Sequence, residues 1–230
     1  AEITGRQLKQ LIEVQRCAIG DTVRVGEING LMGTGTILEL NTSQAVLEIN
    51  LNSPAPPPIP LTLILAMPRP KMLRRSLQTI AAMGAKEIYL INSLRVEKSF
   101  WQTPFLKPEA IEEDFILGLE QARDTRLPEI HIRKRFKPFV EDDLPTLMQG
   151  RQGWVAHPAK QANGPQEGSA ETRRLSPSTK PTLLAIGPEG GFIVYEIEKL
   201  QAAGLVCCDL GPRILRVETA VAVALGQLLP

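Results

Sequence analysis

Two loops rich in glycine and proline carry the residues of this chain that could do chemistry. Residues 185–192 read Ala-Ile-Gly-Pro-Glu-Gly-Gly-Phe, and residues 210–220 read Leu-Gly-Pro-Arg-Ile-Leu-Arg-Val-Glu-Thr-Ala. Each loop follows an apolar strand-like run and precedes a helix-like one. Open α/β sheets bind small ligands where such strands end, and glycines let a ligand approach the main chain. The two loops, about twenty residues apart, therefore predict one pocket built from both.

The pocket lacks the usual nucleotide fingerprints. The G-x-G-x-x-G pattern is absent, and so is the Walker pattern with its lysine. The sequence therefore does not indicate a site for NAD or ATP. Judged by spacing alone, two ordinary connecting turns are an equally good interpretation.

The paired loops resemble the signature of the 16S ribosomal RNA uridine-N3 methyltransferases of the RsmE type, which belong to the SPOUT superfamily of knotted S-adenosylmethionine enzymes. The resemblance rests on Gly187-Pro-Glu-Gly-Gly191, Leu210-Gly-Pro-Arg-Ile-Leu-Arg216 and Glu218-Thr219-Ala220. It implies S-adenosylmethionine as the methyl donor and a uridine of 16S ribosomal RNA, in the small ribosomal subunit, as the acceptor. Two alternatives are a knotted methyltransferase acting on another RNA, and a non-catalytic RNA-binding protein that has kept the fold.

The resemblance assigns the cofactor contacts to both loops. The predicted cofactor-binding residues are Ile186, Gly187, Pro188, Glu189, Gly190, Gly191, Leu210, Gly211, Ile214, Leu215 and Arg216.

Two further residues are candidates for catalysis. Glu120-Gln-Ala-Arg123, followed by Pro128, resembles a family segment, and it predicts the Arg123 guanidinium at the catalytic mouth. The alternative is a cation that stabilises the end of a helix through its dipole. Glu218 is a carboxylate available to accept a proton, although it also suits the first turn of a helix.

Clustered cations provide the candidates for RNA contacts. Four of them stand at the start of a predicted helix, where the helix dipole disfavours positive charge and an RNA phosphate would justify it. The predicted RNA-binding residues are Arg16, Arg69, Lys71, Arg74, Arg75 and Arg213. A solvated charged face is the commoner explanation of such clusters. A second cluster, Arg133 to Lys137, is at least as well explained as a solvated loop.

Composition limits the class of protein. The net charge of the 230 residues is only +1, so an RNA partner needs a local basic face. The chain has three cysteines, Cys17, Cys207 and Cys208. The number is odd and two of them are adjacent in the sequence, which favours reduced thiols and a cytoplasmic protein. No set of cysteines and histidines has the spacing of a zinc site, so no metal is expected. No apolar run is long enough to span a membrane.

The prolines of Ser53-Pro-Ala-Pro-Pro-Pro-Ile-Pro60 predict an extended linker between two domains. Residues 1–55 contain a short helix and three short strands, which indicate a small PUA-like β-barrel for RNA binding. The chain begins with Ala1, so this domain is expected to be incomplete at its start. Residues 60–230 alternate strands and helices and predict an α/β domain with a parallel sheet covered on both faces. Residues 158–181, rich in Pro, Gly, Ser and Gln, are expected to form a long mobile loop.

The last predicted helix, residues 217–229, is almost entirely apolar. A helix that is apolar all round is normally buried on all sides, and a subunit interface would bury it here. The family resemblance likewise implies a homodimer with active sites near that interface. It also implies a SPOUT-like α/β knot, with a trefoil knot that contains the two cofactor loops.

Overall fold

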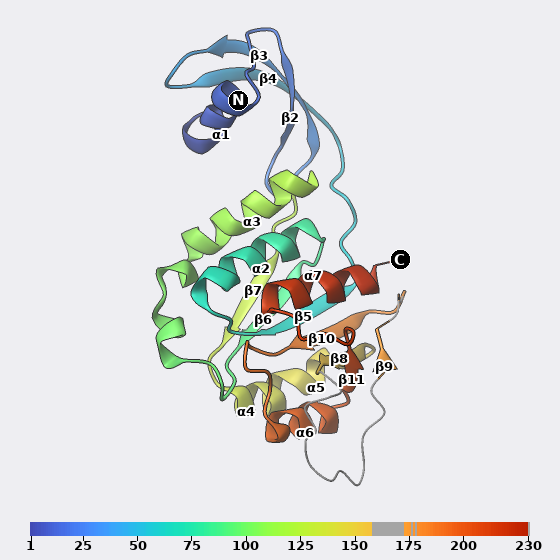
Figure 1. Cartoon of the computed structure of the whole chain (residues 1–230). Coiled ribbons are helices and arrows are strands. Elements are labelled where there is room, and N and C mark those ends of the chain that lie inside the picture. Colours follow the sequence, from blue (N-terminus) through green and yellow to red (C-terminus); the bar gives the residue numbers. More distant parts are fainter. Residues whose placement is uncertain (158–172, 176, 178, 230) are drawn as a thin grey trace. The chain divides into compact units, whose positions relative to one another are not determined.

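A computed structural model describes residues 1–157, 173–175, 177 and 179–229 (Figure 1). Most of the loop predicted at 158–181 lies outside the described residues. The chain divides into two compact units by its contacts. The small unit is Ala1–Pro56 with Arg123–Arg126, and the large unit is Pro57–Ala122 with Leu127–Pro230.

The small unit is an antiparallel sheet with one helical segment. Its strands, in the order β1-β4-β3-β2, are β1 (Glu2–Ile3), β2 (Thr22–Gly26), β3 (Met32–Leu40) and β4 (Ala45–Ser53). The helix α1 (Gly5–Lys9) continues into a π-helical turn, η1 (Gln10–Val14), and contributes Leu8 and Leu11 to the core around Ile37. Residues 123–126 join this unit because the Thr125 hydroxyl donates a hydrogen bond of 2.7 Å to the Gly30 carbonyl.

The large unit is built on a parallel sheet with the strand order β7-β6-β5-β10-β8-β11-β9. Its strands are β5 (Leu61–Ala66), β6 (Glu87–Ile91), β7 (Glu129–Arg133), β8 (Gln152–Ala156), β9 (Arg173–Arg174), β10 (Thr182–Ile186) and β11 (Val206–Asp209). All described strand pairs of this sheet are parallel. β5 and β10 are mainly apolar and buried along their whole length, because both faces of the sheet are covered by helices.

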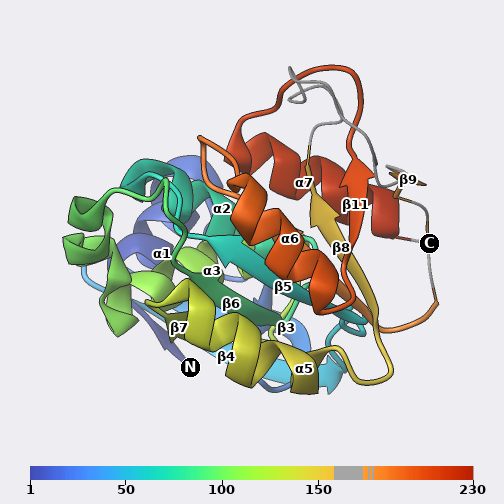
Figure 2. The same cartoon turned by 90° about the horizontal axis from the view of Figure 1, so that it is seen from below.

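Helices lie on both faces of this sheet, as Figure 2 shows. The helices are α2 (Pro70–Ala82), α3 (Pro108–Ala122), α4 (Phe136–Pro138), α5 (Leu144–Leu147), α6 (Val194–Ala202) and α7 (Val217–Leu228), with a π-helical turn η4 (Phe139–Asp143) and 3₁₀ turns η2 (Lys98–Gln102) and η3 (Pro104–Leu106). Alternate residues of each strand face opposite layers. Leu63 and Leu65 pack with α2, α3 and α7, whereas Ile64 and Ala66 pack with η4, α5 and α6.

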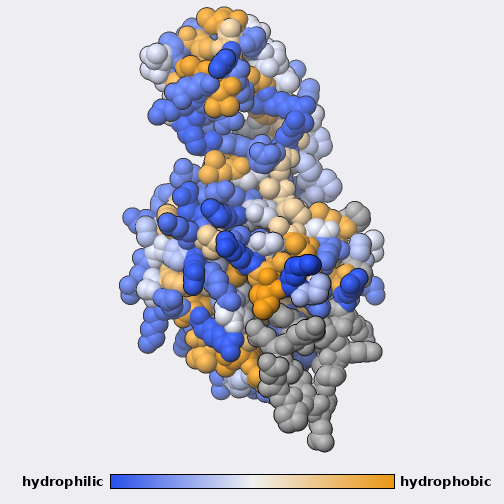
Figure 3. All heavy atoms as spheres, in the orientation of Figure 1, coloured by the Kyte–Doolittle hydropathy of each residue, from blue (hydrophilic) through white to orange (hydrophobic). Residues whose placement is uncertain are grey.

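The predicted α/β architecture with a separate small β unit is therefore confirmed. The short elements β1, β9 and α4 to α5 were not predicted, because two to five residues are too few to show a period. Within a single chain, the last helix is not buried on all sides, so its burial at a subunit interface stays a prediction. α7 buries one side, which includes Val221, Ala224 and Leu225, while Val223 on another side is half-exposed. Hydrophobic residues reach the surface over part of α7 in Figure 3.

The cysteines Cys207 and Cys208 are buried in β11, as their apolar surroundings predict, and all three cysteines are free. Burial raises the pKa of the Cys208 thiol to about 12, with smaller contributions from Cys207 and Asp209. Both thiols are thus unreactive packing residues at neutral pH.

Within the described part of the chain, no helix combines the length and the apolar character needed to cross a membrane.

Candidate functional site

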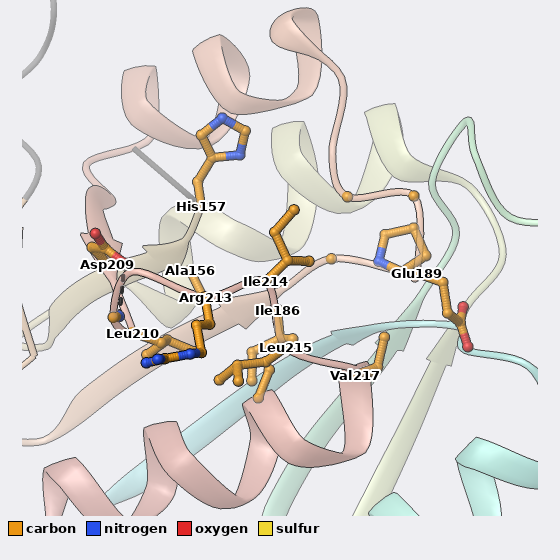
Figure 4. Close-up of a pocket in the computed structure, with 16 residues that line it drawn as sticks. Ala156, His157, Ile186, Glu189, Asp209, Leu210, Arg213, Ile214, Leu215 and Val217 are labelled. Carbon is orange, nitrogen blue, oxygen red and sulfur yellow. Dashed lines mark hydrogen bonds between the residues drawn. The ribbon is translucent and has the colours of Figure 1, made fainter. Parts of the chain in front are cut away.

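A pocket lies at the carboxyl ends of β8, β10 and β11, where the two glycine-rich loops meet (Figure 4). Its lining residues are Ala156, His157, Ile186, Gly187, Pro188, Glu189, Gly190, Gly191, Asp209, Leu210, Gly211, Arg213, Ile214, Leu215, Val217 and Ala220. All predicted cofactor-binding residues except Arg216 are in this set. Arg216 is exposed and immediately precedes α7.

β8 adds residues to the pocket that the loop motifs did not indicate. β8 pairs with both β10 and β11, so Ala156 and His157 lie between the two loops. The pKa of His157 is lowered by burial first and by the positive charge of Arg95 second. Its imidazole is therefore neutral at neutral pH and can accept a proton. Its position at a strand end was the only sequence signal for this role.

The backbone of both loops requires glycine. Gly191 has φ +69° and Gly211 has φ +127°, values that L side chains rarely adopt, and a Cβ on either would meet no atom within 4 Å. A Cβ on Gly187 would instead lie 3.0 Å from the amide nitrogen of Phe192. The Asp209 carboxylate accepts a hydrogen bond of 2.8 Å from the Gly211 N–H and holds the second loop. The two loops thus leave their main chain open to a ligand.

Two neighbouring loops hold the first glycine loop. The Arg69 N–H donates to the Glu189 carboxylate at 2.9 Å, and the Arg95 guanidinium donates to the Gly190 carbonyl. Figure 4 shows the Glu189 side chain directed away from the other labelled residues. The sequence analysis missed Arg95. Its place after a buried strand, in Ser93-Leu94-Arg95, was the available signal.

A buried carboxylate fixes the helix that follows this loop. Glu196, which is 2% exposed, accepts hydrogen bonds from the Ser93 hydroxyl (3.0 Å), the Leu94 N–H (2.8 Å) and the Ile193 N–H (3.0 Å). It therefore joins the start of α6 to the loop after β6. Three hydrogen bonds offset the cost of burying the carboxylate.

The pocket suits a ligand with an apolar ring and several polar groups. Ile186, Leu215 and Val217 provide apolar surface, and the main chain of both loops provides donors and acceptors. The open faces of Gly191 and Gly211 fit a ligand that lies against the backbone. Among the described residues, no group of three or more His, Cys, Asp or Glu side chains could hold a metal ion.

Arg123 is not among the residues that line the pocket of a single chain, so its catalytic role stays a prediction. Arg123 follows α3 and leads into the amino end of β7, whereas the pocket loops follow the carboxyl ends of strands. Its φ of +56° is the left-handed conformation that commonly ends a helix. Glu218 also does not line the pocket. It lies in the first turn of α7, and its Oε2 is buried without a hydrogen-bond partner among the described residues.

The predicted RNA-binding residues fall into different settings. Nε of Arg74 lies 3.1 Å from the carboxylate of the buried Asp114, and this hydrogen-bonded ion pair raises the pKa of Arg74. Cζ of Arg74 also lies 5.0 Å from the centre of the Phe105 ring. The pairing with Asp114 gives Arg74 a structural role, and its predicted contact with RNA stays a prediction. Arg213 lines the pocket. The other four, Arg16, Arg69, Lys71 and Arg75, are exposed, Arg16 in the small unit with φ +54°.

Replacing Arg123 with glycine is expected to raise the free energy of unfolding by up to about 1 kcal/mol, because glycine adopts a positive φ without a Cβ clash. The catalytic rate of the variant is expected to equal that of the wild type, because Arg123 does not line the pocket. Thermal unfolding and a transfer assay measure the two effects. A rate reduced about a hundredfold would instead show that Arg123 acts on the substrate, from a second chain.

The chain is similar to known proteins over most of its length. A family model described as an RNA methyltransferase domain matches residues 55–229. The ribosomal RNA small subunit methyltransferase E of Treponema pallidum is 27% identical over 232 residues, covering 94% of this chain and 79% of the relative. A probable rRNA methyltransferase structure from Porphyromonas gingivalis has a TM-score of 0.71 at 20% identity, covering 98% of this chain and 90% of its own. A putative methyltransferase from Legionella pneumophila, in complex with the bound cofactor SAM, has a TM-score of 0.70 at 21% identity, covering 98% and 89%.

Proposed function

Because the chain belongs to the family of RNA methyltransferase domains, we propose that it transfers a methyl group from S-adenosylmethionine to N3 of a uridine in 16S ribosomal RNA. The observation that carries the proposal is the pocket formed by residues 186–191 and 210–215 at the carboxyl edge of the sheet. The named relative from Treponema pallidum supports the small-subunit RNA as the substrate.

The residues of the pocket fit the proposed cofactor. Ile186, Leu215 and Val217 would hold the adenine ring, and the open main chain at Gly191 and Gly211 would bind the polar groups. Bound there, S-adenosylmethionine supplies an electrophilic methyl group for in-line transfer to a nitrogen. The chain must then hold the uracil close and aligned, and exclude water.

Transfer to N3 also requires loss of the N3 proton, which an acceptor at the pocket would take. His157 lines the pocket and is neutral at neutral pH, whereas the Glu189 carboxylate already accepts a hydrogen bond from the Arg69 N–H. His157 is therefore better placed than Glu189 to receive the proton. Arg213, also in the lining, would face the negative charge that develops on the uracil oxygens.

The rest of the molecule has supporting roles in the proposal. The small unit contributes to RNA binding, with Arg16 as a contact. Two chains associate through the half-exposed side of α7, which places Ala222 and Val223 at the interface. The protein acts in the cytoplasm, where its three free cysteines remain thiols.

The test is transfer of labelled methyl from S-adenosylmethionine to small ribosomal subunits that lack the modification, followed by mass mapping of the product nucleotide. N3-methyluridine in 16S ribosomal RNA is the expected product. A methylated nucleotide in another RNA would identify a different substrate. No transfer to subunits or to bulk RNA, together with intact RNA binding, would favour a non-catalytic RNA-binding protein.

A further inference from the structure

We propose that the loops after β6 and β7 bind RNA phosphates and hold the RNA on one side of the pocket. We call this region the β6–β7 surface; it consists of Arg95, Lys98, Lys134 and Arg135. The inference rests on the proposed function, because it describes how the chain holds the RNA whose uridine enters the pocket.

The topology of the sheet places these cations at the edge that carries the pocket. β5, β6, β7 and β10 are parallel, so the loops after them lie at the same edge. Arg95 reaches the first glycine loop and donates to the Gly190 carbonyl. A Cβ on Gly190 would lie 3.0 Å from Cδ of Arg95, so the aliphatic part of this arginine packs directly on the loop. The β6–β7 surface therefore begins at the pocket itself.

Contacts between the two loops make the surface continuous. The Asn92 N–H donates to the Arg133 carbonyl at 3.0 Å, which extends the β6–β7 pairing beyond the strands. The Trp101 indole N–H donates to the Asn92 side chain at 2.9 Å. Nζ of Lys134 lies 6.0 Å from the centre of the Trp101 ring. A path of direct contacts thus runs from Asn92, in the loop that bears Arg95, to Lys134.

The charges of this surface are available to a ligand. All four side chains are exposed, and no described salt bridge involves them. Residues 92–98 and 134–137 contain one acidic residue, Glu97. Arg133, by contrast, is only partly exposed, and its guanidinium pairs with the Asp143 carboxylate at 3.0 Å.

At the opposite edge of the sheet, Arg151 is engaged within the chain. It donates to the Thr62 hydroxyl at 2.8 Å and pairs with Glu87 at 3.4 Å. With a net charge of only +1 for the chain, the positive charge on the β6–β7 surface is a local excess. Such an excess beside a pocket suits a polyanion.

RNA fits this surface better than an acidic protein does. Single-stranded RNA presents phosphates at regular intervals together with unstacked bases. Leu94, which is 73% exposed, stands beside Arg95 and offers apolar surface to a base next to the target nucleotide. Contacts to phosphates would position the RNA without reading its sequence.

The test uses the full-length chain with Lys134→Ala and Arg135→Ala combined, and Lys180→Ala as the control. Lys180 is also exposed, but it precedes β10 at the opposite edge of the sheet. The dissociation constant of a fluorescent single-stranded RNA is measured against salt concentration. Loss of two phosphate contacts should lower the slope of log affinity against log salt by roughly 1.4 and weaken binding about tenfold. The S-adenosylmethionine dissociation constant, from calorimetry, should not change.

An unchanged salt slope in the double variant, or an equal change in Lys180→Ala, would overturn the inference. Unchanged binding of free RNA with weakened binding of whole small subunits would assign the surface to a ribosomal protein and would also overturn it. RNA binding does not require methyl transfer. A wild type that binds RNA through this surface but transfers no methyl group would therefore disprove the proposed function and leave this inference standing.

Discussion

Replacing Gly191 with valine should weaken S-adenosylmethionine binding roughly ten- to hundredfold, because a β-branched residue at this φ costs about 1–3 kcal/mol. The loop must either hold this strain or move, and a moved loop no longer presents its main chain to the ligand. Calorimetric titration of both proteins with S-adenosylmethionine measures the change. Gly190 is a less informative position, because its Cβ would first meet the flexible side chain of Arg95.

Gly150→Val is the matched control for this experiment. Gly150 has φ +70°, close to the +69° of Gly191, and a Cβ there also meets no atom within 4 Å. It lies between α5 and β8, at the opposite edge from the pocket. Both variants should therefore lose similar stability, whereas only Gly191→Val should lose binding. Equal S-adenosylmethionine affinities in the wild type and Gly191→Val would remove the first glycine loop from the cofactor site.

Leu225→Asp and Val223→Asp should have different consequences, because the two residues lie on different sides of α7. Leu225 is fully buried in the core of the large unit, so an aspartate there should destabilise the fold by about 4 kcal/mol or more. Val223 is half-exposed, so an aspartate there should leave the fold intact and separate the proposed dimer into monomers.

Chemical denaturation measures the first effect, and light scattering at micromolar concentration measures the second. Leu225→Ala is a useful companion, since it removes the side chain without burying a charge and should cost about 2–5 kcal/mol. A wild type that scatters as a monomer, or a Val223→Asp variant that remains dimeric, would refute the proposed interface.

The sequence alone predicted the class of fold and, with the family resemblance, most of the residues that line the pocket. Mainly apolar runs such as 61–66 and 182–186, each followed by a helical period, indicate a parallel sheet, because a sheet covered on both faces buries them. Loops that follow parallel strands share one edge, so the motifs at 187–191 and 211–215 could be assigned to one pocket before any coordinates. Glycine at those positions also predicted an open main chain, and a Cβ at Gly191 or Gly211 would indeed meet no atom within 4 Å.

Only the tertiary structure decided which other residues join that pocket. His157 enters it because β8 lies between β10 and β11, and strand order follows from packing across the whole sheet rather than from local pattern. The sequence does not distinguish the roles of Arg95 and Arg74. In the structure, Arg95 donates to the Gly190 carbonyl of the glycine loop, whereas Arg74 pairs with the buried Asp114. Partners this far apart along the chain meet only after folding. The sequence of α7 is apolar on almost all sides, but only the structure shows which side packs against α2 and β10 and which side is half-exposed.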